Sequence, residues 1–198
     1  MDFDHPPAEP LAALERWLDD ARGTDLRNPH AMTLATVDPD GRPSARIVLL
    51  KGLDERGAVF YTNRHSRKGR ALDAKPRATL LLHFDALLRQ VCIEGRVTHL
   101  DDDEADAYFA SRPRGAQIGA WASRQSEPVD SRASLEAQVA AVEERFEGQR
   151  VPRPPHWMGY RVSLDRIEFW QGRPDRLHDR IVYERGDGGT WTTIRLCP

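Results

Sequence analysis

The pattern of short β-rich runs broken by turn sequences constrains the fold of this chain most strongly. Ala31–Val37, Ser44–Lys51 and Ala58–Asn63 are rich in apolar and β-branched residues. Asp38-Pro39-Asp40-Gly41 and Asp54-Glu55-Arg56-Gly57 separate them. Both are strong turn signals, because Asp, Pro and Gly favour the backbone angles of tight turns. The three runs therefore predict an antiparallel meander.

The rest of the chain alternates between helical and strand-like segments. Apolar residues recur at helical spacing in Pro10–Arg22, and Ser66–Lys75 starts with a capping Ser and stops before a Pro. Further helices are expected at Asp101–Arg112, Gln117–Ser123 and Ser134–Phe146. Further strands are expected at Arg77–Phe84, Leu87–Leu100, Tyr160–Ser163, Arg166–Trp170, Ile181–Arg185 and Thr190–Leu196. The predicted class is mainly β with flanking helices (α+β), built around a barrel.

A Pro-rich connector, Val151–Pro155, has the composition of a domain boundary. We interpret it as a loop, because the four strands expected after it are too few to bury a core of their own and should complete the first sheet. A length of 198 residues also fits one domain. The expected organisation is a helical arm over residues 1–27 followed by one barrel domain over residues 28–198.

Charge and cysteine content exclude several classes of function. The net charge of -2 argues against a nucleic-acid-binding protein. Cys92 and Cys197 form neither a disulfide framework nor a metal-ligand spacing, the seven His residues lack a ligand pattern, and so no metal site is expected. The N-terminus lacks a signal-peptide pattern and no apolar run is long enough to cross a membrane, which predicts a cytoplasmic protein without membrane contact.

Cationic side chains flank a strongly apolar run, Arg46-Ile47-Val48-Leu49-Leu50-Lys51. A cation at an inward-facing strand position is costly to bury without an anion, so this run points to a negatively charged ligand nearby. The alternative is that both basic side chains reach solvent at the strand ends.

Ser66-Arg67-Lys68 places two cations in the first turn of a predicted helix, where they oppose the helix dipole. A bound phosphate would reverse that effect, because the free N–H groups at a helix start and basic side chains both attract anions. Tyr61 and Thr62, at the end of the preceding strand, can add a hydroxyl and a backbone N–H group. A solvated basic turn and ordinary strand packing of Tyr61 are the alternatives.

Tyr108 and Arg112 lie four residues apart on one predicted helix face, and Arg114 follows them. Such a group can hold a second anion, although basic residues near a helix C-terminus are also common for dipole reasons alone. Neutral polar groups able to pair with an amide-like ring edge are Gln90, Gln125 and Ser126.

The segment Arg166–Arg180 gathers a Trp, several Arg and a His. Trp170 offers a flat apolar wall, and Arg176 and Arg180 suit phosphate or a delocalised oxyanion. His178 can hydrogen-bond a heteroaromatic ring or exchange a proton near neutral pH. These residues predict a pocket for a flat, polar, phosphorylated ligand. The alternative is a charged hairpin loop held by neighbouring aspartates.

In these motifs the chain resembles the pyridoxine (pyridoxamine) 5'-phosphate oxidase family. The similarity runs from about Asn28 to Pro198. Its pieces are Arg46–Lys51, Phe60–Asn63, Ser66–Lys68, Arg89–Val91, Tyr108-Phe109, Ser111–Arg114, Gln117–Trp121, Gln125-Ser126 and Ile167–Arg180. Several motifs in the same order make a chance match improbable.

The resemblance implies an FMN-binding split β-barrel that works as a homodimer, with FMN at the subunit interface. The FMN site would be lined by Arg46, Ile47, Val48, Leu49, Leu50, Lys51, Tyr61, Thr62, Arg67, Lys68, Gln90, Gln125, Ser126, Trp170 and Arg180, some of them from the partner subunit. The substrate phosphate would be held by Lys51, Tyr108 and Arg112. Arg176 and His178 would contact the pyridine side of the substrate and act as the catalytic residues.

The implied reaction is oxidation of pyridoxamine 5'-phosphate and pyridoxine 5'-phosphate to pyridoxal 5'-phosphate, with O2 as electron acceptor and H2O2 as product. One position departs from the family, which usually has Ser as a further phosphate ligand where this chain has Ala116. This departure keeps open a related FMN oxidase of a larger aromatic precursor, of the phenazine type. A further alternative, from another class of function, is a non-catalytic carrier of flavin or pyridoxal phosphate.

Overall fold

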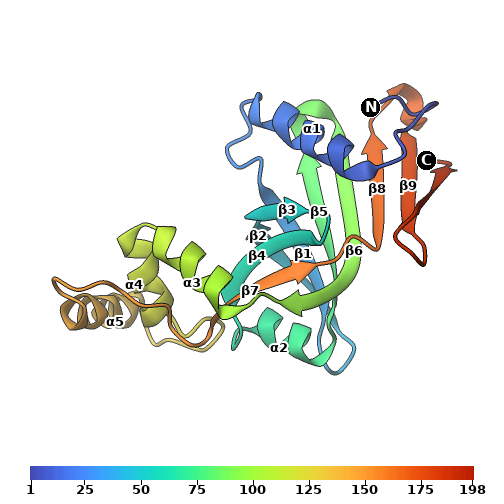
Figure 1. Ribbon diagram of the computed structural model, residues 1–198. Helices are drawn as coiled ribbons and strands as arrows, with labels where there is room; N and C mark the ends of the chain where they lie inside the picture. The colour runs from blue at the N-terminus through green and yellow to red at the C-terminus, as the bar shows by residue number, and fades with distance from the viewer.

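Ten strands form one hydrogen-bonded sheet that curls into a split barrel (Figure 1). The computed structural model describes residues 1–198. The strands are β1 (Ala31–Val37), β2 (Pro43–Leu49), β3 (Gly52–Asp54), β4 (Gly57–Asn63), β5 (Arg77–Phe84), β6 (Arg89–His99), β7 (Trp157–Val162), β8 (Arg166–Gln171), β9 (Asp179–Arg185) and β10 (Trp191–Leu196). The helices are α1 (Pro10–Arg22), α2 (Arg67–Ala74), α3 (Asp102–Ser111), α4 (Arg114–Ala122) and α5 (Arg132–Arg145), with short 3-10 turns η1 (Asp85–Leu87) and η2 (Pro174–Arg176).

The strands pair in the order β10-β9-β8-β6-β5-β1-β2, and β7 links β6 to β4. All the pairs are antiparallel. The four strands after the Pro-rich connector thus complete the sheet begun by the first six, as the sequence predicts. The mainly β class with flanking helices is confirmed.

The predicted meander is wrong at one point, between β2 and β4. β2 pairs only with β1, whereas β3 and β4 form a separate hairpin that continues through β7. The change happens at two consecutive residues, because the Leu50 N–H donates to His30 O while the Lys51 N–H donates to Val59 O. β2 therefore ends at Leu49, and Lys51 lies in the short connection between β2 and β3 rather than at the end of a strand.

β6 belongs to both parts of the barrel. Its first half pairs with β8 and its last residues pair with β7, while β5 follows nearly its whole length. Gly95 lies at the change of partner, where a Cβ atom would stand 1.9 Å from Ser163 O. Only glycine lets the two backbones approach this closely.

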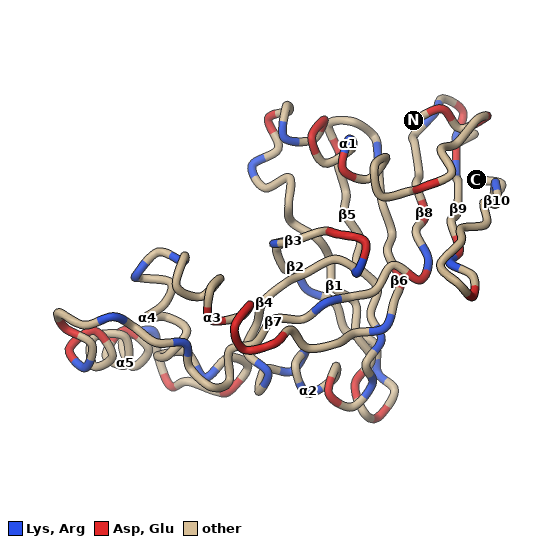
Figure 2. The backbone as a smooth tube through the Cα atoms, viewed as in Figure 1, with Lys and Arg blue, Asp and Glu red and all other residues tan.

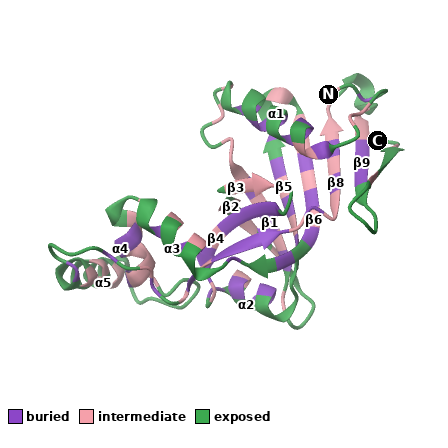
Figure 3. Cartoon of the chain, in the orientation of Figure 1, coloured by how far each residue is buried: buried purple, intermediate pink, exposed green.

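α1 closes one end of the barrel with an apolar face. Leu14, Trp17 and Leu18 are buried in the main core, and the Trp17 ring meets Phe169 of β8 edge-on at 5.1 Å. Figure 3 shows the buried positions gathered along the central strands and the inner side of this helix.

Helices α3, α4 and α5 project from the barrel on the side away from β8 and β9 (Figure 1). A small second core, consisting of Phe109, Ile118, Phe146, Val151 and Trp157, holds them together. Asp101 caps the start of α3, and its carboxylate accepts from the Glu104 N–H. The helix ends before Arg112, because the Pro that follows Arg112 disfavours helical angles there. Figure 2 shows Lys and Arg interleaved with Asp and Glu along the chain rather than gathered on one basic face.

Candidate active site

A cleft lies between β2, β4, the start of α2 and the end of α3. Its first chamber has a volume of about 310 Å³ and is lined by Arg46, Ile47, Val48, Leu49, Lys51, Tyr61, Thr62, Lys68, Tyr108, Arg112, Gln125 and Trp157. All of these except Trp157 belong to the predicted cofactor or substrate residues. A second chamber of about 350 Å³ shares Tyr61, Thr62, Arg112, Gln125 and Trp157 with the first and extends past Ala116 to Ser123.

Three aromatic rings form one flat wall of the cleft. Tyr61 stacks on Tyr108 with 4.1 Å between ring centroids and on Trp157 with 4.9 Å, both nearly parallel. Burial is the largest cause that raises the pKa of Tyr61, followed by the charge of Glu104, so its hydroxyl stays protonated at neutral pH. The wall therefore offers a flat, uncharged surface.

Lys68 reaches the cleft from the first turn of α2. Its Nζ donates to Gln125 Oε1 at 2.8 Å and to Thr62 Oγ1 at 3.3 Å, and the Thr62 hydroxyl also donates to Gln125 Oε1 at 3.1 Å. Burial, with the charge of Arg46 as a second cause, lowers the pKa of Lys68 to about 8. The ammonium is thus held by neutral oxygens alone.

Arg46 points across β1, and its hydrogen-bond partners, like those of Lys68, are all neutral oxygens. Its guanidinium donates to Leu34 O, Thr36 Oγ1 and Ser44 Oγ at 2.6 to 3.1 Å. Burial and the positive charge of Arg67 lower the pKa of Arg46. Asp38, whose charge acts on Arg46, forms its ion pair with Arg67 at 2.6 Å instead.

Arg112 has the least satisfied cation of the cleft. Its Nη1 is buried without any hydrogen-bond partner, while the guanidinium lies over the Trp157 ring at 5.0 Å. Burial lowers the pKa of Arg112. Arg112 is the C-cap of α3, one residue past the end of the helix, and lines the cleft beside Tyr108. The sequence predicts that both residues lie on one helix face, and this is wrong because Arg112 is outside the helix.

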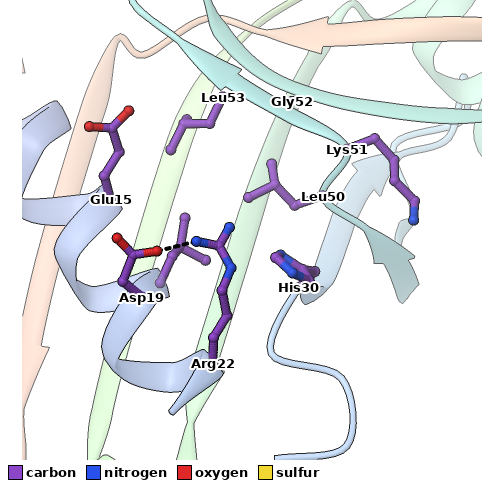
Figure 4. Close-up of a pocket in the computed structure, with 9 residues that line it drawn as sticks. Glu15, Asp19, Arg22, His30, Leu50, Lys51, Gly52 and Leu53 are labelled. Carbon is purple, nitrogen blue, oxygen red and sulfur yellow. Dashed lines mark hydrogen bonds and ion pairs between the residues drawn. The ribbon is translucent and has the colours of Figure 1, made fainter. Parts of the chain in front are cut away.

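Lys51 lines both this cleft and a separate cavity of about 350 Å³ under α1 (Figure 4). In that cavity Arg22 pairs with Asp19, and Glu15 adds a second carboxylate. Leu50, a predicted cofactor residue, lines this cavity and is buried against the main core. The cavity under α1 is therefore balanced in charge, whereas the cleft has an excess of cations.

Two predicted cofactor residues lie beside the cleft rather than in its wall. Arg67 is turned toward Asp38, and its backbone N–H donates to Ser126 Oγ at 3.1 Å. Ser126 has a positive φ of 75°, which is uncommon for a residue other than glycine. These contacts fix the loop that carries Gln125 to the start of α2.

The remaining predicted residues lie on another part of the sheet. Gln90, Trp170 and Arg180 occupy neighbouring positions on β6, β8 and β9, and β1, β5 and β6 stand between β2 and β8. Their hydrogen bonds and ring contacts are local. Arg180 donates to Glu168 Oε1 at 2.7 Å, and the Trp170 ring lies 4.6 Å from that of His178. Arg176 is the last residue of η2, has a positive φ of 62° and makes no hydrogen bond through its side chain.

Trp157, which closes the aromatic wall, is not among the residues that the sequence predicts for the site. The first residue of β7 is Trp157, directly after the Pro-rich connector, whereas the predicted strand begins only at Tyr160. The one sequence feature that could have indicated Trp157 is its position as an aromatic residue just after a Pro-rich loop. No group of three or more His, Cys, Asp or Glu side chains is placed to hold a metal ion, and no helix is long and apolar enough to span a bilayer.

Comparison with known families decides the classification. The profile described as pyridoxamine 5'-phosphate oxidase matches residues 18–146. The chain belongs to this family. A second profile, described as the pyridoxine 5'-phosphate oxidase C-terminal dimerisation region, matches residues 157–198 and supports a homodimer. Members of the family are oxidases, and FMN is the cofactor that goes with this family and fold.

Similar proteins are found in several bacteria. A pyridoxine/pyridoxamine 5'-phosphate oxidase of Rubrobacter xylanophilus is 57% identical over 190 residues, covering 96% of this chain and 87% of that protein. One of the same name from Burkholderia lata is 58% identical over 193 residues, covering 96% and 89%. Among solved structures, PhzG of Burkholderia lata in complex with tetrahydrophenazine-1-carboxylic acid has a TM-score of 0.92 at 38% identity, covering 99% of this chain and 96% of that one. An FMN-binding protein of Nostoc punctiforme shares the fold, with a TM-score of 0.78 at 20% identity, 98% of this chain and 100% of that one.

Proposed function

We propose that this protein oxidises pyridoxamine 5'-phosphate and pyridoxine 5'-phosphate to pyridoxal 5'-phosphate, using FMN and O2 and releasing H2O2. The alcohol substrate loses two electrons and two protons, which O2 takes up as H2O2. The amine substrate loses the same electrons and protons to give an imine, and water then releases ammonia. Names of relatives at more than half identity and the chemistry of the cleft support this substrate class.

The excess of positive charge in the cleft carries the proposal. Four cationic side chains line it without forming an ion pair to any carboxylate, namely Arg46, Lys51, Lys68 and Arg112. Unpaired cations this close together repel one another and are costly to desolvate. Two bound phosphates, each close to dianionic at neutral pH, would balance them, and FMN and the substrate bring one phosphate each.

The residues of the cleft fit FMN. Lys68, with neutral oxygens as its partners, and Arg46 would hold the coenzyme phosphate, and the Gln125 amide suits the polar edge of a flavin ring. When bound, FMN supplies the two-electron redox chemistry of the reaction. The protein supplies orientation and a preorganised set of charges.

Arg112, Lys51 and Tyr108 would hold the substrate phosphate at the other end of the chamber. The orphaned Nη1 of Arg112 is the strongest single mark of a missing anion, because a buried donor without an acceptor costs about 1 to 3 kcal/mol. With the phosphate held there, the aromatic wall would limit how the pyridine ring tilts.

Residues on β6, β8 and β9 would complete the site from the partner subunit. Gln90, Trp170 and Arg180 line neither chamber of the cleft in their own chain, and at least two strands, β5 and β1, separate each of them from β2. In a homodimer they would reach the partner's cleft, with Arg180 near the flavin. Arg176 and His178 would then orient the substrate ring, His178 as a positioning group rather than an indispensable base.

Two observations favour a second candidate, an FMN oxidase of a larger aromatic precursor. Ala116 and Gly119 leave the second chamber open where the family usually has a Ser hydroxyl. The structure of PhzG, with its phenazine ligand, is also closely similar in fold. A third candidate, a non-catalytic flavin or pyridoxal-phosphate carrier, has the same fold but would not reduce the flavin.

Anaerobic mixing separates the three functions. The yellow FMN-loaded protein is mixed with pyridoxamine 5'-phosphate, pyridoxine 5'-phosphate or tetrahydrophenazine-1-carboxylic acid, and air is then readmitted. We expect either vitamer phosphate to bleach the flavin and oxygen to restore the colour with formation of H2O2. Bleaching by the phenazine alone would favour the second function, and no bleaching by any of them would leave the carrier. Arg112→Gln serves as the control, and vitamer-driven bleaching should be much slower in it.

A further inference from the structure

Arg161 on β7 joins two segments of the cleft from behind. It is the only charged residue among the buried residues, with 8% of its surface exposed. One nitrogen donates to Asp54 Oδ1 at 2.8 Å and another donates to Glu104 Oε1 at 3.2 Å. A buried guanidinium with two carboxylates at fixed positions has little freedom to move, because both hydrogen bonds are directional.

The two carboxylates belong to the segments that carry the proposed substrate-phosphate ligands. Asp54 ends β3, which starts directly after Lys51. Glu104 lies in the first turn of α3, whose other end carries Tyr108 and is capped by Arg112. Arg161 therefore lies between the segment of one ligand and the helix of the other two.

A separate contact holds α3 in place without Glu104. Arg153 from the connector donates to Asp102 Oδ1 and Asp106 Oδ1 of the helix and to Trp157 O. Loss of the Glu104 contact should consequently shift α3 slightly rather than release it. Arg161 would also keep Asp54 as a partner, so no buried charge is orphaned.

We propose that Arg161 is a positioning residue, which sets the separation between Lys51 and the Tyr108–Arg112 pair and thereby the affinity for the substrate phosphate. This inference rests on the proposed function, because it assigns these three side chains to one phosphate. It adds a residue that touches neither substrate nor cofactor.

Glu104→Ala tests the proposal, with Asp103→Ala as its matched control. Both variants remove one carboxylate from the first turn of α3, but Asp103 is exposed and its side chain makes no hydrogen bond or ion pair. Binding of pyridoxal 5'-phosphate to the FMN-loaded protein is followed by quenching of tryptophan fluorescence, and KM, kcat and the Kd for FMN are measured beside it. Thermal unfolding checks that each variant is folded.

We expect Glu104→Ala to raise the Kd for pyridoxal 5'-phosphate and the KM roughly three- to tenfold, the range of one lost hydrogen-bonded contact. Its kcat and Kd for FMN should stay unchanged, and Asp103→Ala should match the wild type throughout. Equal effects in the two variants, or an equal loss of FMN affinity in Glu104→Ala, would overturn the positioning role alone. A wild-type protein that binds no pyridoxal 5'-phosphate would overturn the proposed function and this inference with it.

Discussion

At the scale of single residues, Lys68 is a partly buried cation whose hydrogen-bond partners are all uncharged. Burial and the nearby Arg46 lower the pKa of Lys68 to about 8 from an ordinary value of 10.5. In the ligand-free protein the ammonium therefore loses its proton just above neutral pH. A bound phosphate would favour the charged form and raise this pKa again.

The affinity for FMN should consequently depend on pH. Below pH 8 Lys68 is already charged and binding is strongest, whereas above it binding requires uptake of a proton and should weaken by up to about tenfold per pH unit. Titration of the apoprotein with FMN, followed by flavin fluorescence, measures this. Lys68→Arg should remove the dependence, because guanidinium stays charged, and Lys68→Met should bind weakly at every pH. A wild-type curve as flat as that of Lys68→Arg would contradict the role of Lys68.

Ala116 gives a second prediction at this scale. It lines the second chamber together with Arg112, and a hydroxyl there would add a donor near the proposed substrate phosphate. Because a hydrogen bond to a charged group contributes about 1.5 to 3 kcal/mol, Ala116→Ser should lower the KM for pyridoxamine 5'-phosphate by about tenfold or more. Pyridoxamine without its phosphate is the control substrate and should gain nothing. An equal gain for both would place the new hydroxyl away from the phosphate.

At the scale of elements, the sequence predicts most boundaries and fails where tertiary contacts decide them. Pro10–Arg22, Ala31–Val37 and Arg77–Phe84 have the predicted bounds, since period, caps and prolines are local signals. β3 is missed, because its three residues have no periodicity and become a strand only by pairing with β4. α4 begins at Arg114 rather than Gln117, because Pro113 occupies the N-cap and its fixed φ suits a helix start.

The residues of the candidate site could likewise be predicted where the signal is local, but not where it depends on contacts between distant segments. Arg46 and Lys68 stand out as cations in places where burial or the helix dipole disfavours them, and such local conflict can be read from the sequence, whereas Arg112 is singled out only by its spacing from Tyr108. The pairing of Arg67 with Asp38 was not readable, because a β-turn residue 29 positions away supplies the carboxylate. The role of Arg161 could not be predicted from the sequence either. Its partners Asp54 and Glu104 come within reach of it only when β7 lies between the β3–β4 hairpin and α3.

The β4–β7 pair supports the aromatic wall, and its glycine gives a prediction. Gly159 stands opposite Tyr61, and a Cβ atom there would lie 2.5 Å from Leu100 Cδ1 and 2.8 Å from Tyr61 Cε1. Gly159→Ala should therefore displace the Tyr61 ring and cost about 1 to 3 kcal/mol of unfolding free energy, as overpacking does. Urea denaturation measures the change. Gly115→Ala on α4 meets no atom within 4 Å and should be neutral or stabilising.

At the scale of the whole molecule, the sheet divides the predicted site between its two ends. Residues of β2 and β4 line the cleft, while Trp170 belongs to β8, Arg176 ends η2 and His178 follows η2. β8 stands well apart from β2 and β4 in Figure 1. The C-terminal match to a dimerisation region covers residues 157–198, which contain all of the second group. No local sequence pattern could reveal this division, because the order of residues along a chain does not show whether two groups of site residues act within one subunit or across two.

A site shared between subunits makes a distinctive prediction for mixed dimers. In a two-fold dimer of Arg112→Gln with Arg176→Gln chains, one site carries both substitutions and the other carries neither, so a purified heterodimer should show about half of the wild-type activity. Each homodimer should be strongly impaired. The control pair is Arg112→Gln with Lys51→Gln, because both residues line the same cleft and every site of that heterodimer keeps one defect. Co-expression with two different affinity tags isolates the heterodimers. If the two pairs were equally inactive, each site would be built from a single chain, and Arg176 would act on the cleft of its own subunit or not at all.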